Sequence, residues 1–328
     1  MRTSAKQNRR IAAAAASVFA LGFVAFVLWR GSGTIDAAQG YLMGSIVNIT
    51  TVRNPLKKSP TADSLLQQFE AVGRKCEELW NNSPASDTEL TAFARQIAEE
   101  TDGAFHPGLK ALINLWNIES KDGSPPYVPT ASEIQAALTL CDWTDDSALH
   151  FGAIGKGAML DTAAAFQTDN PLSFPESMLL DFGGNILSLG SKTLGKPWRV
   201  ALRDPQGGGS AGIFTLSGRY FISTSGGYEK YFIQNGISYH HIFDSRTGCP
   251  AETGNLLSVS VVTSGQDHAG ALGDALSTAA FVLGYAKAIP ILEAHDCAAV
   301  FLYKDGSARA VGTVRQILTL TESYRWYK

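Results

Sequence analysis

The sequence predicts an α+β fold, with a mainly helical first part over residues 41–148 and a second part that contains strands over residues 149–328. In the first part, apolar residues recur at helical spacing through several segments. In the second part, short runs rich in β-branched residues are separated by turns and by a few helical segments. Strands interleaved with only a few helices are typical of the α+β class.

The first thirty residues stand apart from this globular part. Residues 11–29 carry no charge, and a run of this length is enough to cross a bilayer as a helix. Basic residues before the run outnumber the single Arg30 after it, so the positive-inside rule keeps the N-terminus in the cytoplasm. We therefore expect residues 1–30 to form a membrane anchor in the cell inner membrane, residues 31–40 to be a linker, and the domain to lie on the periplasmic side. A cleaved signal segment is the alternative.

In the first part we expect one strand followed by helices. Residues 44–52 alternate with β-branched side chains, which favours a strand. Residues 61–63 begin a helix that continues to about residue 80. Further helices are expected over residues 87–101, 108–117 and 130–138.

In the second part we expect a helix over residues 157–166 after a glycine-rich turn, and another over residues 274–284 that ends at Gly284. Short strands are expected around these helices, over residues 178–181, 198–203, 213–217, 220–223, 257–262, 298–303 and 313–320.

Charge and cysteine content argue against two kinds of binding site. A net charge of −3 gives no electrostatic reason to expect a nucleic-acid partner. The four cysteines are Cys76, Cys141, Cys249 and Cys297. No pair of them has C-x-x-C spacing, which argues against a zinc site. In an exported domain they could form disulfides, and buried free thiols are the alternative.

Two short segments concentrate the polar chemistry of the chain. Residues 240–248 read HHIFDSRTG, and residues 274–278 read DALST. Asp274 and Thr278 stand four residues apart, which places both side chains on one face of a helix. A carboxylate and a hydroxyl together suit a hard cation such as Mg²⁺. The alternatives are a helix cap for Asp274 and, for Thr278, a hydroxyl bonded to its own helix.

These segments resemble the ApbE family of flavin transferases, the FAD:protein FMN transferases. Further stretches agree with the family in order and spacing. They are GAIGKGAMLD at 152–161, DFGGN at 181–185, PWRV at 197–200 and STSGGYE at 223–229. The resemblance as a whole covers nearly everything after residue 40. The resemblance implies a T-fold-like core over residues 41–328, with FAD in a cleft between its two parts. The chain departs from the family at Ala158, where an aromatic residue is usual, and lacks a recognisable Ser-x-Leu-Ser-x-x-Asn segment between Asn81 and Leu90.

The resemblance implies three metal ligands: Asp274, Thr278 and the backbone carbonyl of Gly155. It also makes His241 the candidate general base, because a threonine hydroxyl is a poor nucleophile until a positioned imidazole takes its proton. His240 should point to the opposite face, since side chains alternate on an extended segment. Asp244 is expected to orient His241 or to join the metal site, with a turn residue as the alternative. A role for His241 in orienting phosphate or flavin also stays open.

Nine residues are expected to bind FAD or to shape its pocket: Lys156, Asp161, Gly183, Gly184, Ser225, Gly226, Tyr228, Thr247 and Gly248. Lys156 lies in a turn that opens a helix, where backbone amides and the positive helix end suit a diphosphate. The resemblance assigns Asp161 to the adenosine part of FAD. A solvated surface lysine and an exposed helix carboxylate are the respective alternatives.

The sequence thus predicts an enzyme that uses Mg²⁺ and takes FAD as its substrate. It would transfer FMN to a threonine hydroxyl of a partner, by resemblance a flavoprotein subunit of a membrane redox complex, and release AMP. Two alternatives are an FAD pyrophosphatase, in which water attacks instead, and a flavin-binding protein without activity.

Overall fold

The computed structural model describes residues 33–53, 59–119, 123–169, 174–175 and 177–327. A nine-stranded sheet runs through the molecule, with neighbours antiparallel except for the last pair. Its strands lie in the order β1 (Thr34–Leu42), β2 (Ser45–Arg53), β3 (Met178–Phe182), β4 (Asn185–Leu189), β7 (Tyr220–Gly226), β12 (Leu256–Thr263), β13 (Ala298–Tyr303), β14 (Ser307–Val311) and β16 (Arg325–Trp326).

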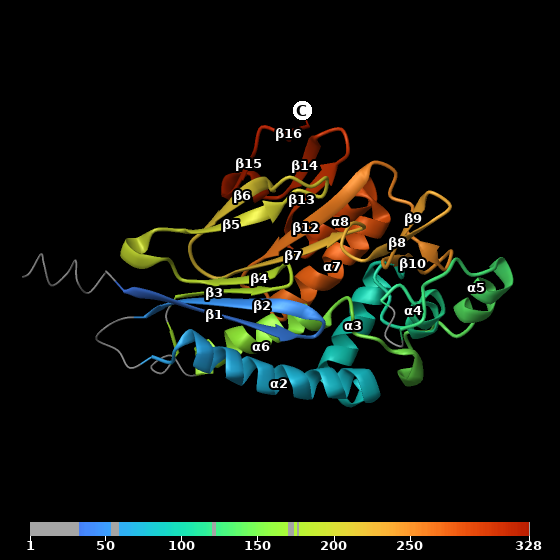
Figure 1. Ribbon diagram of the computed structural model, residues 1–328, viewed down its shortest axis with the longest axis horizontal. Coiled ribbons are helices and arrows are strands. Elements are labelled where there is room, and N and C mark those ends of the chain that lie inside the picture. The colour runs from blue at the N-terminus through green and yellow to red at the C-terminus, as the bar shows by residue number, and fades with distance from the viewer. Residues whose placement is uncertain (1–32, 54–58, 120–122, 170–173, 176, 328) are drawn as a thin grey trace, which may run out of the picture.

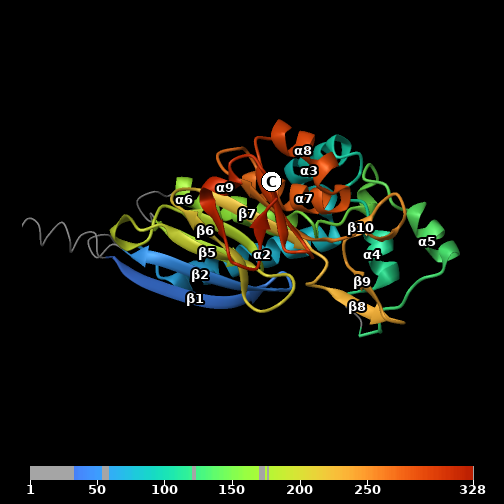
Figure 2. The same ribbon diagram turned by 90° about the horizontal axis from the view of Figure 1, so that it is seen from above.

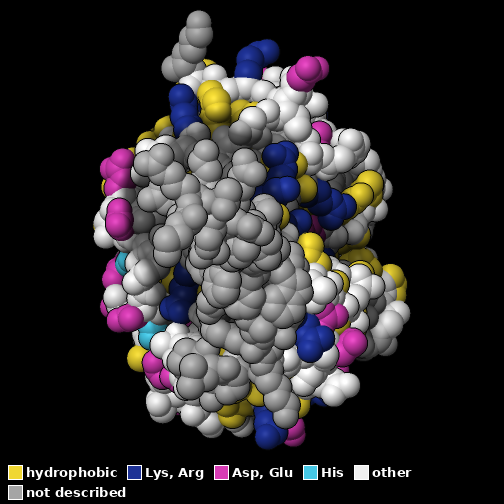
Figure 3. Space-filling model, turned by 90° about the vertical axis from the view of Figure 1, so that its left-hand side faces the viewer, with side chains coloured by type: hydrophobic (Ala, Val, Ile, Leu, Met, Phe, Trp, Pro, Cys, Tyr) yellow, Lys and Arg dark blue, Asp and Glu magenta, His cyan; other side chains and the backbone are white. Residues whose placement is uncertain are grey.

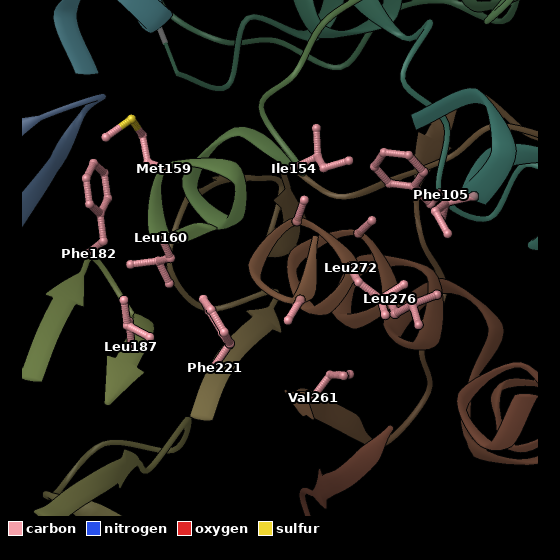
Figure 4. Packing of buried hydrophobic residues seen from close by; sticks show 14 of the residues in the cluster. Phe105, Ile154, Met159, Leu160, Phe182, Leu187, Phe221, Val261, Leu272 and Leu276 are labelled. Atoms are coloured by element: carbon pink, nitrogen blue, oxygen red, sulfur yellow. The ribbon is translucent and has the colours of Figure 1, made fainter. Parts of the chain in front are cut away.

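Helices cover one face of this sheet (Figure 1). They are α2 (Ala62–Asn82), α6 (Gly155–Asp169) and α7 (Ala269–Leu283), with α3 (Thr88–Glu100) packed against α7 and α8 (Tyr285–Ala294) following it. Leu160 of α6 and Leu272 of α7 lie among buried side chains of the sheet such as Phe221 (Figure 4). Burying a leucine stabilises the fold by about 1.5–3 kcal/mol, so this layer holds the two helices firmly against the strands.

A three-stranded sheet packs on the opposite face (Figure 1; Figure 2 gives the view from above). Its strand order is β15 (Leu318–Leu320), β6 (Ser210–Leu216) and β5 (Trp198–Arg203). Trp198 and Phe214 are buried between the sheets, and the Trp198 indole N–H donates to the carbonyl of Leu189 at 3.1 Å. The short helix α9 (Val314–Ile317) leads into β15. The large sheet is therefore the middle of three layers.

A smaller apolar cluster lies at one end of the molecule. It joins α4 (Lys110–Trp116) and α5 (Ala131–Leu138) to the hairpin β8 (Tyr231–Gln234) and β9 (Ile237–His240), and to the pair β10 (Phe243–Asp244) and β11 (Cys249–Pro250). Trp116 is at its centre, with ring centroids 5.7 Å from Tyr239 and 5.9 Å from Phe243. The cluster thereby holds residues 240–248 in place at this end of the molecule.

The structure corrects the expected boundaries at the start of the domain. Residues 34–42 form β1 of the large sheet, so the linker expected over residues 31–40 is wrong for most of its length. The strand β2 pairs with β3, which places strands from both expected parts in one sheet. The sequence does not show this strand, because its sheltered face carries Asp36, Ala38 and Gly40 while Ile35 and Tyr41 are exposed, which is not the pattern of apolar residues on the buried face.

Seven strands and the helix α8 were not expected from the sequence either; the strands are β4, β8, β9, β10, β11, β14 and β16. The strand expected over residues 313–320 is wrong for residues 314–317, which form the helix α9, and β15 follows it. The membrane-spanning run expected at residues 11–29 lies outside the described residues. Within the described ranges, none of the helices combines the length and the apolar character that a bilayer crossing requires. At the end of the molecule where β1 begins, the described side chains in view include both Lys or Arg and Asp or Glu (Figure 3).

Helices α6 and α7 touch through two glycines. A Cβ atom on Gly157 would lie 2.1 Å from the carbonyl oxygen of Gly270, and a Cβ on Gly270 would lie 2.3 Å from that of Gly157. Real carbon and oxygen atoms do not approach so closely, so the two backbones pack with no space for a side chain. This contact sets the distance between the helices.

We therefore expect Gly157→Ala to lower the free energy of unfolding by about 3 kcal/mol, because a methyl group must push the helices apart. Gly273→Ala is the matched control on α7, since its Cβ would meet Ser223 Oγ at an ordinary 3.4 Å. Alanine also has the higher helix propensity, so the control should change stability by no more than about 1 kcal/mol. Urea unfolding of both variants measures the difference, and equal stabilities would contradict the close helix contact.

Candidate functional site

A pocket of about 300 Å³ opens where α6 begins against α7. Six of the residues that the sequence predicts for the site line it: Lys156, Ser225, Gly226, His241, Asp274 and Thr278. They come from α6, β7, the segment after β9, and α7. Segments separated by more than a hundred residues thus meet at one cavity. The volume is at the lower end of the range for small-molecule sites.

Asp274 and Thr278 lie on the same face of α7, which begins at Ala269, five residues earlier than expected. Asp274 is therefore not a cap of its own helix. It is 5 % exposed, and its Oδ2 accepts the N–H of Gly157 at 2.9 Å. The Ser225 hydroxyl lies 3.2 Å from the Thr278 hydroxyl and 2.8 Å from the Ser277 hydroxyl. A carboxylate and a row of hydroxyls thus face the pocket together.

These groups fit Mg²⁺ better than a softer metal. Within the described residues, no cluster of three or more His, Cys, Asp or Glu side chains could enclose a metal ion. Mg²⁺ does not need such a cage, because it keeps several waters and is bound through one or two carboxylates together with substrate phosphates. Asp274 and Thr278 would hold it from the protein side.

The predicted carbonyl ligand, Gly155, is not brought to the pocket wall. Gly155 is the first residue of α6, and its Cα packs near the side chains of Trp80 and Met43. A carbonyl in the first turn of a helix already accepts a hydrogen bond from the residue four positions later. Only its second lone pair would be available to a cation.

The two neighbouring histidines have different surroundings. His240 is held at both ring nitrogens, since Nδ1 accepts the N–H of Ile242 at 3.3 Å and Nε2–H donates to the carbonyl of Ala251 at 3.2 Å. His241 lines the pocket, and its Nδ1 lies 3.2 Å from the carbonyl oxygen of Lys230. A carbonyl only accepts, so Nδ1 carries the proton and Nε2 is the nitrogen that can accept one.

The pKa of His241 is lowered to about 4, mainly by burial, with smaller contributions from the charges of Lys230 and Lys156, while Glu119 acts in the opposite direction. The imidazole is therefore neutral at physiological pH. Lys230 forms an ion pair with Glu119 at 2.8 Å beside it, and both side chains line the pocket. A neutral histidine with Nε2 unprotonated is the form that a general base requires.

Lys156 brings positive charge to the same cavity. It is the second residue of α6, whose N-terminal amides carry the positive end of the helix dipole. It lines the pocket, and its charge contributes to the low pKa of His241. Burial raises the pKa of Asp181, and the charge of Lys156 opposes that rise. A lysine at a helix N-terminus suits an anionic ligand such as a diphosphate.

Asp161 does not reach the pocket. Its two carboxylate oxygens accept the N–H groups of Gly270 at 2.7 Å and Ala271 at 2.8 Å, at the N-terminus of α7. The pKa of Asp161 is raised to about 6, because burial outweighs the two amide donors, which act in the opposite direction. It is therefore neither an exposed carboxylate nor placed to touch a ligand in the cavity.

Asp244 also lies outside the pocket lining. Its Oδ1 accepts the backbone N–H of Arg246 at 2.9 Å, and its Oδ2 forms an ion pair with the Arg246 guanidinium at 2.7 Å. These contacts lower the pKa of Asp244 despite its partial burial. The turn continues through Thr247, whose N–H donates to the Asp244 carbonyl at 3.1 Å. Asp244 thus forms the turn that was its alternative role.

The remaining predicted residues do not line the pocket. Gly183 and Gly184 form the turn between β3 and β4 with φ of +60° and +92°, and a Cβ on Gly183 would clash with Ser45, a lining residue. The Tyr228 ring lies beneath Arg203, 5.4 Å from its guanidinium carbon. The carbonyl of Gly248 accepts the Trp116 indole N–H at 2.9 Å.

Several lining residues were missed or given little weight in the sequence. An apolar wall includes Trp80 and Phe151, whose rings meet edge to face with centroids 6.2 Å apart. Met43, His106 and His150 also line the cavity. They lie on segments far in sequence from residues 240–278, so no local spacing links them to that part of the site. The four cysteines are free thiols in the structure.

The two packed sheets and their helical layer define an α+β protein with a polar pocket at the start of α6, beside α7. The sequence profile of the ApbE family matches residues 43–301. An FAD:protein FMN transferase from Treponema pallidum (strain Nichols) is 35 % identical over 255 residues, which cover 68 % of this chain and 67 % of that protein. The chain therefore belongs to the ApbE family.

Solved structures agree with this assignment. The apo form of the Pseudomonas stutzeri flavinyl transferase ApbE superposes with a TM-score of 0.68 at 28 % identity, covering 89 % of this chain and 96 % of that one. The ApbE protein from Thermotoga maritima superposes with a TM-score of 0.73 at 23 % identity, covering 87 % and 99 %. The second likeness shows a shared fold.

Proposed function

We propose that the protein is a flavin transferase that moves FMN from FAD to a hydroxyl of an acceptor protein and releases AMP. The proposal rests on one observation: a positive charge, a pair of cation ligands and a neutral imidazole all line the same pocket. Lys156 supplies positive charge, Asp274 and Thr278 supply cation ligands, and His241 supplies a neutral imidazole. The names of the relatives support flavin transfer as the overall reaction.

In this proposal Lys156 and the N-terminus of α6 hold the diphosphate of FAD. Mg²⁺, bound by Asp274 and Thr278, would neutralise the diphosphate charge. His241 Nε2 takes the proton of the acceptor threonine while its Nδ1–H stays bonded to the Lys230 carbonyl. The threonine oxygen then bonds to the phosphorus of the FMN half, the bond from that phosphorus to the bridging oxygen breaks, and AMP leaves with that oxygen.

We further propose that residues 11–29 anchor the protein in the inner membrane and that the domain acts on the periplasmic side. An acceptor there would be a flavoprotein subunit of a membrane redox complex. Both proposals are supported by the charge pattern of the sequence around the uncharged run.

The decisive experiment mixes the protein with FAD, Mg²⁺ and candidate acceptor fragments and follows intact mass together with AMP. Transfer adds the mass of FMN, less one water, to an acceptor threonine and releases one AMP for each modified chain. Free FMN and AMP in equal amounts without an acceptor would point to a pyrophosphatase. Tight FAD binding with no AMP under any metal would leave a binding protein and overturn the proposal.

The pH dependence should reflect the low pKa of His241. A base with a pKa of about 4 stays neutral from pH 7.5 to 5.5, so single-turnover AMP release should change by less than about twofold over that range. A histidine with an ordinary pKa near 6.5 would lose about tenfold there. Because the folded pKa lies below the unfolded value, His241 also destabilises the fold as the pH drops from about 6.5 towards 4. A tenfold loss of rate centred near pH 6.5 would contradict this environment.

A further inference from the structure

Helices α6 and α7 hold each other by two reciprocal carboxylate contacts. Asp161 of α6 accepts the amides of Gly270 and Ala271 at 2.7 and 2.8 Å, in the first turn of α7. Asp274 of α7 accepts the amide of Gly157 at 2.9 Å, in the first turn of α6. Each helix thus supplies the anion that the free amides at the other helix's N-terminus require.

Helix α7 has no cap of its own. Its N-cap residue, His268, has a left-handed backbone with φ of +52° and makes no side-chain capping bond. The carboxylate of Asp161 therefore replaces the local cap from a neighbouring helix. Because Gly157 and Gly270 are in direct backbone contact, a shift of α7 cannot be absorbed by side chains between the helices.

A shift of α7 would also move the residues of this helix that line the pocket. Asp274 and Thr278 lie within two and a half turns of the amides that Asp161 binds, and both line the cavity, whereas Asp161 does not. We propose that Asp161 is a positioning residue that sets α7 so that Asp274 and Thr278 can bind the cation. This inference rests on the proposed function, and it replaces the adenosine contact expected for Asp161 from the sequence.

The two roles predict different binding behaviour, which flavin fluorescence can measure in the full chain. An adenosine contact contributes to FAD affinity whether or not metal is present. A positioning residue contributes only to the gain in FAD affinity that Mg²⁺ produces. The experiment therefore titrates FAD in EDTA and again with Mg²⁺, and also measures kcat and KM for AMP release.

For Asp161→Ala we expect metal-free FAD affinity within about twofold of the unaltered protein. The gain in affinity from Mg²⁺ and the kcat should each fall by about 10–100-fold, as for other residues that orient metal ligands. Asp169→Ala is the matched control, an exposed carboxylate at the end of the same helix, and should change neither. Asp161→Glu keeps both acceptor oxygens and should recover part of the loss.

Asp161→Asn covers the case in which the alanine variant does not fold, because it keeps one acceptor for the α7 amides. It should show the same selective loss of the Mg²⁺ effect, to a smaller degree. If an Asp161 variant bound FAD tenfold more weakly without metal and kept its kcat, Asp161 would contact the adenosine part of FAD, and the inference would be overturned. An asparagine variant that matches the unaltered protein in every measurement would also overturn it. Absence of Mg²⁺-enhanced FAD binding in the unaltered protein would instead overturn the proposed function itself.

Discussion

Asp274→Ala should lower Mg²⁺-dependent AMP release by roughly 10³-fold or more. Asp274 supplies the carboxylate of the proposed cation site, and a bound cation stabilises developing phosphate charge by several kcal/mol. Each 1.36 kcal/mol of lost stabilisation is a tenfold change in rate. The measurement is single-turnover AMP release over a series of Mg²⁺ concentrations.

Asp274 also accepts the amide of Gly157, so the alanine variant could lose activity through altered packing. Asp274→Asn separates the two effects, because an amide oxygen can still accept that hydrogen bond but carries no charge. We expect it to melt close to the unaltered protein and to be as inactive as the alanine variant. Asp267→Ala, an exposed carboxylate just before α7, should be fully active. An asparagine variant with normal Mg²⁺-dependent turnover would place the cation elsewhere.

His241→Ala should slow transfer to the acceptor by about 10²–10⁴-fold while FAD affinity changes little. A base that takes a proton only in the transition state contributes to the rate and not to ground-state binding. The hydrogen bond from Nδ1 to the Lys230 carbonyl and the low pKa of the ring both favour the neutral form that can act this way. FAD titration and single-turnover transfer on the same preparation test the two parts together.

His240→Ala is the matched control in the neighbouring position. Its two ring hydrogen bonds and its edge contact with Phe281, at a centroid distance of 5.5 Å, are structural. Removing them should lower the free energy of unfolding by about 1–3 kcal/mol and leave transfer by the folded protein nearly unchanged. If His240→Ala slowed transfer more than His241→Ala, the assignment of the base would be reversed. If both variants lost FAD binding equally, neither histidine would be the base.

Much of the secondary structure follows from local signals in the sequence. Thr61 caps α2 by accepting the N–H of Ser64 at 3.1 Å, and Thr130 forms a capping box with Glu133 at the start of α5. Such contacts lie within a few residues of each other, so local spacing predicts them. The start of α7 could not be predicted in this way, because its capping carboxylate is Asp161, more than a hundred residues earlier.

The family, the α+β class and the residue types of the site could be predicted from the sequence, because those follow from composition, local periodicity and motif order. Which of those residues line the pocket depends on the tertiary structure. It gathered Asp274, Thr278 and His241 there and turned Asp161 and Asp244 to structural contacts. The physical reason is that a carboxylate binds a cation, caps a helix or pairs with an arginine according to what lies within about 3 Å of it. That neighbourhood is set by the packing of α6 on α7 and by the register of the sheet, which no local pattern contains.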